Sequence, residues 1–144
     1  MERNDRMWPR GEQPTKQGQM ALIGVISDEP EIVMALDVAL NGYGHTVSRL
    51  GAGDSTGWLA GTVPDLFVVD LDPDPATAMS HIRRLIEDDA TALTPVLVTG
   101  TAEQAVALAG VCALGAAGYL HKPFTSVEAR SATERALLTA LPAL

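Results

Sequence analysis

Short apolar runs alternate with segments of helical spacing along most of this chain, from Ala21 to the C-terminus. Three of the runs show no polar alternation, which is the pattern of strands covered on both faces. They are ALIGVI at 21–26, LFVV at 66–69 and PVLVTG at 95–100. The segment HTVSRL at 45–50 alternates instead and predicts a strand near an edge of the sheet. The short run YLHK at 119–122 is stopped by a proline and completes five predicted strands.

Helical spacing of apolar residues fills the stretches between these runs. Pro30 stands near the start of the first helix, where a proline fits, and Gly115 stands at the end of another, where a left-handed residue is common. Thr77 is a helix-capping residue type and is expected to begin the helix after the third strand. The predicted helices lie within 28–44, 55–61, 77–89, 103–114 and 127–141.

The alternation of strands and helices predicts an α/β fold. We expect a doubly wound parallel sheet of five strands with helices on both faces. Residues 1–19 are polar and broken by prolines and glycines, so they predict a disordered leader before a folded domain at 20–144. In such sheets ligands bind beyond the carboxyl ends of the strands, near the point where the strand order reverses.

Composition narrows the possible functions. A chain of 144 residues, 47% of them hydrophobic, is one domain with a substantial core, and its net charge of -8 disfavours binding to nucleic-acid phosphates. The charge-free stretch 104–120 is too short to span a membrane and contains three glycines, which favours a buried helix, turn and strand. Cys112 is the only cysteine and predicts an inert, buried thiol. No signal peptide is evident, so we expect a cytoplasmic protein with no direct nucleic-acid or membrane partner.

Polar residues gather at the predicted carboxyl ends of four strands. They are Ser27 and Asp28, Asp70 and Asp72, Thr99 and Gly100, and Lys122. Clustered carboxylates repel one another, and Mg²⁺ suits a site made only of oxygen ligands. Lys122 and Thr99 then match partners for phosphoryl oxygens, while one carboxylate could act as a nucleophile and form an aspartyl phosphate. A solvated turn with an unrelated surface lysine is the simpler explanation of each feature taken alone.

Four motifs together resemble the response-regulator receiver domain of two-component signalling. They are VISDEPEI at 25–32, PDLFVVDLDP at 64–73, PVLVTGTA at 95–102 and GAAGYLHKPF at 115–124. The resemblance extends from Ala21 to the C-terminus and implies a flavodoxin-like fold of the receiver type. It also implies that Asp70 is the phosphoacceptor, which attacks a phosphohistidine of a partner kinase.

The resemblance further implies how the other strand-end residues act. Asp28, the Asp70 carboxylate and the backbone carbonyl of Asp72 would bind Mg²⁺. Thr99 and Lys122 would contact the phosphoryl group together with Gly100, and Tyr119 matches an aromatic switch residue that responds with Thr99. The resemblance thus implies one set of residues that binds Mg²⁺ and a second set that contacts the phosphoryl group or responds to it.

Two departures from the family pattern affect these expectations. The family usually has two consecutive acids after the first strand, but Ser27 stands in the first position and could hold only a metal-bound water, so magnesium affinity should drop. After Asp70 the prolines stand on either side of the usual position, and Asp72 and Asp74 place negative charge near an incoming phosphate. We expect Asp74 to face water.

These observations support a stand-alone receiver, because the chain ends after the last predicted helix. Its expected partners are a histidine kinase or phosphotransfer protein and a downstream protein target, with a homodimer conceivable through the charge-poor stretch 104–120. One alternative is a degenerate receiver that binds partners without phosphorylation. Another is a haloacid-dehalogenase-like phosphatase, which VVDLDPD also resembles, although no acidic pair follows Lys122. The three histidines show no metal-ligand spacing and are assigned no role.

Overall fold

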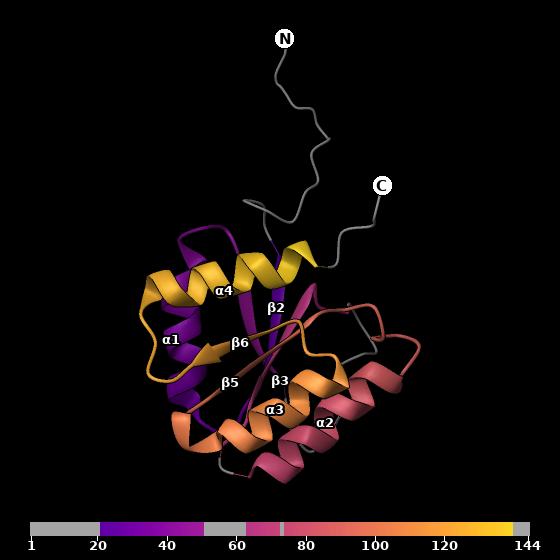
Figure 1. Cartoon of the computed structure of the whole chain (residues 1–144). Helices are drawn as coiled ribbons and strands as arrows, with labels where there is room; N and C mark the ends of the chain where they lie inside the picture. Colours follow the sequence, from indigo (N-terminus) through magenta and orange to yellow (C-terminus); the bar gives the residue numbers. More distant parts are fainter. Residues whose placement is uncertain (1–20, 51–62, 73, 140–144) are drawn as a thin grey trace.

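The computed structural model describes residues 21–50, 63–72 and 74–139 of the chain (Figure 1). The predicted leader at 1–19 and the predicted short helix at 55–61 lie outside the described residues. The described elements are β2 (Leu22–Ile26), α1 (Pro30–Asn41), β3 (Thr46–Leu50), β4 (Leu66–Asp70), α2 (Pro75–Glu87), β5 (Val96–Gly100), the 3-10 helix η3 (Ala102–Gln104), α3 (Ala105–Leu114), β6 (Gly118–His121) and α4 (Ser126–Leu138).

Five strands form one parallel sheet in the order β3-β2-β4-β5-β6. The predicted fold class is therefore confirmed, and the alternating strand β3 lies at an edge, as its pattern predicted. The chain leaves β2 for β3 on one side and returns to β4 on the other, so the strand order reverses between β2 and β4. The crevice beyond the carboxyl ends of these two strands is the expected ligand position.

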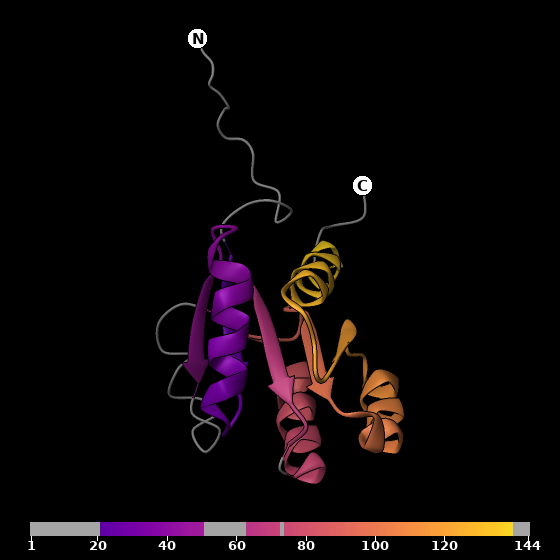
Figure 2. The same ribbon diagram turned by 90° about the vertical axis from the view of Figure 1, so that its left-hand side faces the viewer.

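Helices cover both faces of the sheet, as Figures 1 and 2 show. On one face α1 and α4 bury apolar residues against the strands, and on the other face α2 and α3 do the same. The two central strands β4 and β5 are buried along their whole length, which explains their apolar sequences. Burial therefore extends to the last residues of both strands, Asp70 and Gly100.

The helix after β4 begins earlier than predicted. Thr77 is not the N-cap, because the Asp74 carboxylate accepts a hydrogen bond from the Ala76 backbone N–H at 3.1 Å and Pro75 is the first helical residue. The Thr77 hydroxyl instead donates to Asp74 at 2.7 Å. Asp74 is exposed, as predicted, and it also caps α2. The predicted stop at Gly115 is confirmed by its left-handed backbone, with φ at 111°.

The exposure of residues on α3 shows that a second prediction, the burial of Cys112, was wrong. Cys112 is exposed rather than buried, and Val106 on the same helix is 89% exposed. The helix contains only apolar residues, so its sequence does not show which side faces the sheet. Among the described residues, no helix is both long enough and apolar enough to cross a membrane.

Candidate functional site at the carboxyl edge of the sheet

The carboxylate of Asp70 lies at the end of the buried strand β4 and is itself buried. The Ser27 hydroxyl, which follows β2, donates to Asp70 Oδ2 at 2.9 Å. The backbone N–H of Asp72 donates to Asp70 Oδ1 at 3.0 Å, and the Lys122 ammonium donates to the same oxygen at 2.9 Å. Residues from three separate parts of the chain therefore meet at one carboxylate.

Lys122 is shared among three carboxylates. Its Nζ lies 2.6 Å from Asp72 Oδ2, 2.9 Å from Asp70 Oδ1 and 3.6 Å from Glu29 Oε1. Burial alone would lower the pKa of the Lys122 ammonium, but the hydrogen bonds to Asp72 and Asp70, together with the negative charges of these two groups, outweigh burial and raise the pKa. The hydrogen bond from Lys122 is also the main reason that the pKa of Asp72 is lowered. Both groups are charged in the resting site.

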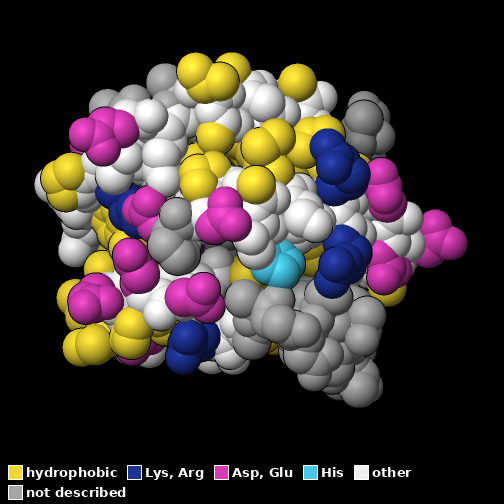
Figure 3. Space-filling view, turned by 90° about the horizontal axis from the view of Figure 1, so that it is seen from below, with side chains coloured by type: hydrophobic (Ala, Val, Ile, Leu, Met, Phe, Trp, Pro, Cys, Tyr) yellow, Lys and Arg dark blue, Asp and Glu magenta, His cyan; other side chains and the backbone are white. Residues whose placement is uncertain are grey.

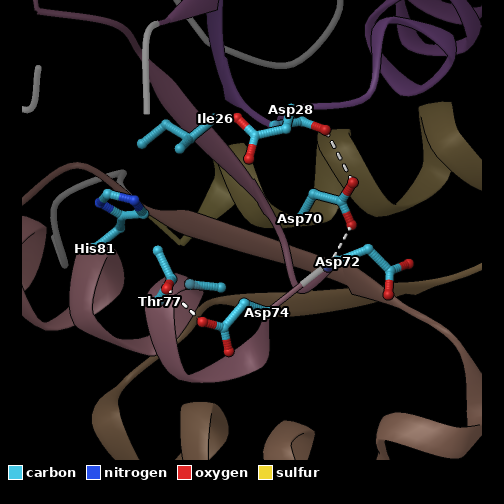
Figure 4. A pocket seen from close by; sticks show the side chains of 9 residues that line it. Ile26, Asp28, Asp70, Asp72, Asp74, Thr77 and His81 are labelled. Atoms are coloured by element: carbon cyan, nitrogen blue, oxygen red, sulfur yellow. Dashed lines mark hydrogen bonds between the residues drawn. The ribbon is translucent and has the colours of Figure 1, made fainter. Parts of the chain in front are cut away.

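A pocket of about 90 Å³ lies beside Asp70 and opens at the carboxyl edge of the sheet. It is lined by Ile26, Ser27, Asp28, Asp70, Asp72, Asp74, Thr77, Ala78 and His81. Figure 4 shows the carboxylates of Asp28, Asp70 and Asp74 around this space, with His81 on the side away from Asp72. Acidic side chains also gather on this face of the molecule in the space-filling view of Figure 3. The pocket is therefore small, and four aspartates give it negative charge.

Both the hydroxyl and the backbone carbonyl of Ser27 are held by hydrogen bonds. The Glu29 backbone N–H donates to the Ser27 hydroxyl at 3.0 Å, and Arg49 Nε, from the end of β3, donates to the Ser27 carbonyl at 3.1 Å. These bonds orient the hydroxyl so that its proton points to Asp70. Ser27 thus contacts the predicted phosphoacceptor directly.

Thr99 and Tyr119 do not reach the pocket. Thr99 pairs with Asp70 across β4 and β5, but its buried hydroxyl donates to the Leu120 carbonyl at 2.7 Å. The half-buried Tyr119 hydroxyl donates to the Gly100 carbonyl at 2.8 Å. The predicted phosphoryl contact of Thr99 therefore requires its hydroxyl to leave this carbonyl.

Gly100 is buried at the end of β5, where the chain passes close to two side chains. A Cβ at this position would lie 2.6 Å from Gln104 Oε1 and 2.9 Å from Leu71 Cδ1. Only glycine leaves room for both neighbours in their present positions. Gly100 does not line the pocket, so its predicted phosphoryl contact stays a prediction.

Comparison with family models finds no match for this sequence, and comparison with curated proteins finds none either. Solved structures do match. The chemotaxis response regulator CheY4 of Vibrio cholerae shares 20% identity with a TM-score of 0.70, over 81% of this chain and 98% of that one. A signal receiver domain of a histidine kinase from Syntrophus aciditrophicus shares 22% identity with a TM-score of 0.70, over 82% of this chain and 90% of that one. NtrX from Brucella abortus shares 21% identity with a TM-score of 0.74.

This chain has the receiver-domain fold. The match to NtrX covers 84% of this chain and only 28% of the NtrX chain, so the similarity there concerns one part of a longer protein. The receiver fold explains why Asp70, Thr99 and Lys122 lie at neighbouring strand ends, as the sequence motifs predicted. At this level of identity the similarity establishes the fold alone.

The donor set in this receiver fold suits Mg²⁺, which prefers oxygen ligands and keeps several waters. Asp28 and Asp70 line the same pocket, and Asp28 is exposed at its wall. Among the described residues, no three His, Cys, Asp or Glu side chains form a metal-binding group. The predicted magnesium site needs only two carboxylates and the Asp72 carbonyl, so it remains a prediction that the pocket chemistry supports.

Three residues near the receiver site were missed by the sequence interpretation. Glu29 faces Lys122, and Gln104 donates from Nε2 to Asp72 Oδ1 at 2.6 Å. His81 lines the pocket from α2, and burial lowers its pKa, which favours the neutral imidazole. The sequence offered one clue, because Gln104 is a polar residue at the start of an apolar helix.

Proposed function

We propose that this chain is a receiver domain that accepts a phosphoryl group on Asp70 in the presence of Mg²⁺. The donor would be a histidine kinase or a phosphotransfer protein, and the output would be a changed surface for a downstream protein. The observation that carries the proposal is the Asp70 carboxylate, buried at a strand end, lining a pocket and 2.9 Å from the Lys122 ammonium. A cytoplasmic location follows from these partners.

The proposed reaction is a direct transfer to a carboxylate oxygen of Asp70. The new O–P bond forms as the bond from phosphorus to the donor breaks, and the donor leaves with the electron pair. With acetyl phosphate as donor, the leaving group is acetate. With a phosphohistidine as donor, the leaving group is imidazole, whose leaving nitrogen takes up a proton. Lys122 stabilises the charge that develops on the phosphoryl oxygens. Mg²⁺, held by Asp28, Asp70 and the Asp72 carbonyl, would supply further positive charge when bound.

The negative charge of the pocket explains why transfer to Asp70 needs both the Lys122 ammonium and Mg²⁺. The transferred group adds about -1.5 to -2 charge at neutral pH. It would enter a pocket already lined by Asp28, Asp72 and Asp74, with Lys122 as the ammonium that contacts Asp70. Without a divalent cation this concentration of negative charge opposes transfer.

The test is reaction with acetyl phosphate and Mg²⁺, followed by intact-protein mass spectrometry. Wild-type protein should gain one phosphoryl group that hydroxylamine removes, as expected for an acyl phosphate. Asp70→Asn should gain none. Asp74→Asn is the matched control, because it changes an acid in the same pocket and keeps a good helix cap, and it should still gain the group. A wild-type protein that stays unmodified, or an Asp70→Asn variant that is modified equally, contradicts the proposal.

One observation favours a second candidate, a receiver that binds partners without phosphorylation. Both oxygens of Asp70 are already occupied, by Ser27 and by Lys122 together with the Asp72 backbone N–H. The chain itself thus neutralises the phosphoacceptor. Magnesium titration separates the two candidates, because a folded protein that binds no Mg²⁺ at Asp28 and Asp70 and forms no adduct belongs to the second.

A further inference from the structure

The side chain of Gln104 connects two loops at the edge of the phosphoacceptor site. Its Oε1 accepts from the Thr101 backbone N–H at 2.8 Å, and its Nε2 donates to Asp72 Oδ1 at 2.6 Å. A backbone N–H can only donate, so Oε1 must face Thr101 and the amide nitrogen must face Asp72. Gln104 therefore ties the end of β5 to the loop that follows β4.

The second oxygen of Asp72 continues this chain of contacts to the phosphoacceptor. Asp72 Oδ2 lies 2.6 Å from Lys122 Nζ, and the same nitrogen lies 2.9 Å from Asp70 Oδ1. The exposed fractions of the side chains are 26% for Asp72, 10% for Lys122 and 0% for Asp70. The contact that competes with Asp70 for Lys122 is thus mostly shielded from water.

An ammonium has three N–H donors, and those of Lys122 face carboxylates. Two contact Asp70 and Asp72, while Glu29 lies 3.6 Å away with 43% of its side chain exposed. A phosphoryl oxygen can take the third donor, in the place of the loosely held Glu29. Its negative charge would then lie beside the Asp72 carboxylate, which is bound to the same ammonium.

We propose that Gln104 is a positioning residue that holds Asp72 on Lys122, and that this latch of Gln104, Asp72 and Lys122 opens when Asp70 is phosphorylated. The proposal rests on the proposed function. Repulsion between the added phosphoryl charge and the Asp72 carboxylate drives the opening. Asp72 lies in the loop after β4 and is partly exposed, so it can turn toward water.

Opening of the latch would change the contacts at the start of α3. Gln104 ends η3 directly before α3, and its Oε1 packs over Gly100 at the end of β5. The Gly100 carbonyl accepts the hydrogen bond of the Tyr119 hydroxyl. Release of Gln104 from Asp72 therefore frees the side chain of the α3 N-cap residue, which lies over the backbone that holds Tyr119.

The experiment measures the initial rate of adduct formation with acetyl phosphate and Mg²⁺. Gln104→Glu keeps the acceptor for the Thr101 N–H but replaces the donor to Asp72 with a repelling oxygen. Asp72→Asn removes the charge that competes for Lys122. Each variant should react roughly three- to tenfold faster than wild type, since one hydrogen bond no longer has to break. The double variant should be no faster than Asp72→Asn alone, because Gln104 acts through Asp72.

A second readout follows the latch itself. In ¹⁵N NMR spectra, the side-chain amide protons of Gln104 should exchange faster with water after phosphorylation of wild-type protein. Unchanged or slower rates in both single variants, or fully additive effects in the double variant, overturn the latch while the wild-type adduct leaves the proposed function standing. If folded wild-type protein forms no adduct at all, the proposed function fails and the latch fails with it.

Discussion

Replacement of Ser27 by aspartate would restore the acid that receiver sequences usually carry and would test how the resting site is balanced. The buried Ser27 hydroxyl donates to Asp70 Oδ2 at 2.9 Å. A carboxylate in its place would lie about 4 Å from that of Asp70, where like charges repel by about 4 kcal/mol at an effective dielectric constant near 20. Loss of the hydrogen bond adds about 1 kcal/mol. The free energy of unfolding should therefore fall by about 4–5 kcal/mol in magnesium-free buffer, a large part of the ~5–15 kcal/mol typical of a domain.

Magnesium should reverse much of this loss, because the introduced acid adds a ligand beside Asp28 and Asp70. At a free Mg²⁺ concentration of about 100 times its Kd, binding adds about 2.7 kcal/mol. The assay is urea unfolding of wild type, Ser27→Asp and Ser27→Asn, with Mg²⁺ or with a chelator. Ser27→Asn matches the size of aspartate without its charge and should gain no more stability from Mg²⁺ than wild type does. Equal unfolding midpoints for the two variants in chelator, or no gain for Ser27→Asp with Mg²⁺, would refute this reasoning.

Three further predictions concern other contacts of the described residues. Lys122→Met leaves Asp70 and a second carboxylate without their shared ammonium, so the free energy of unfolding in urea should fall by about 3 kcal/mol at pH 7, and an unchanged value would contradict the ion-pair network. His45 is buried, and burial lowers the pKa of its imidazole from 6.5. The unfolded chain therefore takes up a proton first, so the free energy of unfolding should decrease as pH falls below about 6.5. His45→Leu should flatten this pH dependence between about pH 7 and 5. Tyr119→Phe removes a hydroxyl that donates to a backbone carbonyl and should cost about 1 kcal/mol by the same measurement, whereas no loss would mean that the bond is absent in solution.

The sheet could be predicted because the pattern of apolar and polar residues in each strand reflects how that strand is buried. The uninterrupted apolar runs of β4 and β5 follow from burial on both faces, and the alternation of β3 follows from its place at the edge. The strand-end rule alone then predicts that Asp70 and Lys122 lie close together. These features depend on local sequence or on a general property of parallel sheets.

The parts that were wrong or missed depend either on a choice between two neighbouring caps or on contacts between distant segments. Asp74 and Thr77 are both capping residue types, and only the position of Pro75 as first helical residue distinguishes them. The exposed side of α3 could not be predicted, because an apolar helix shows no polar face in its sequence. The contact of Gln104 with Asp72 requires two loops to meet, and neither loop specifies the other.

The exposed thiol of Cys112 gives this receiver fold a practical advantage. It is the only cysteine of the chain and lies in the last turns of α3, the helix that follows Gln104. A maleimide dye or a nitroxide spin label would therefore attach at one known place on the unaltered sequence. Fluorescence or electron paramagnetic resonance of that label could report movement of α3 in real time, without any engineered site.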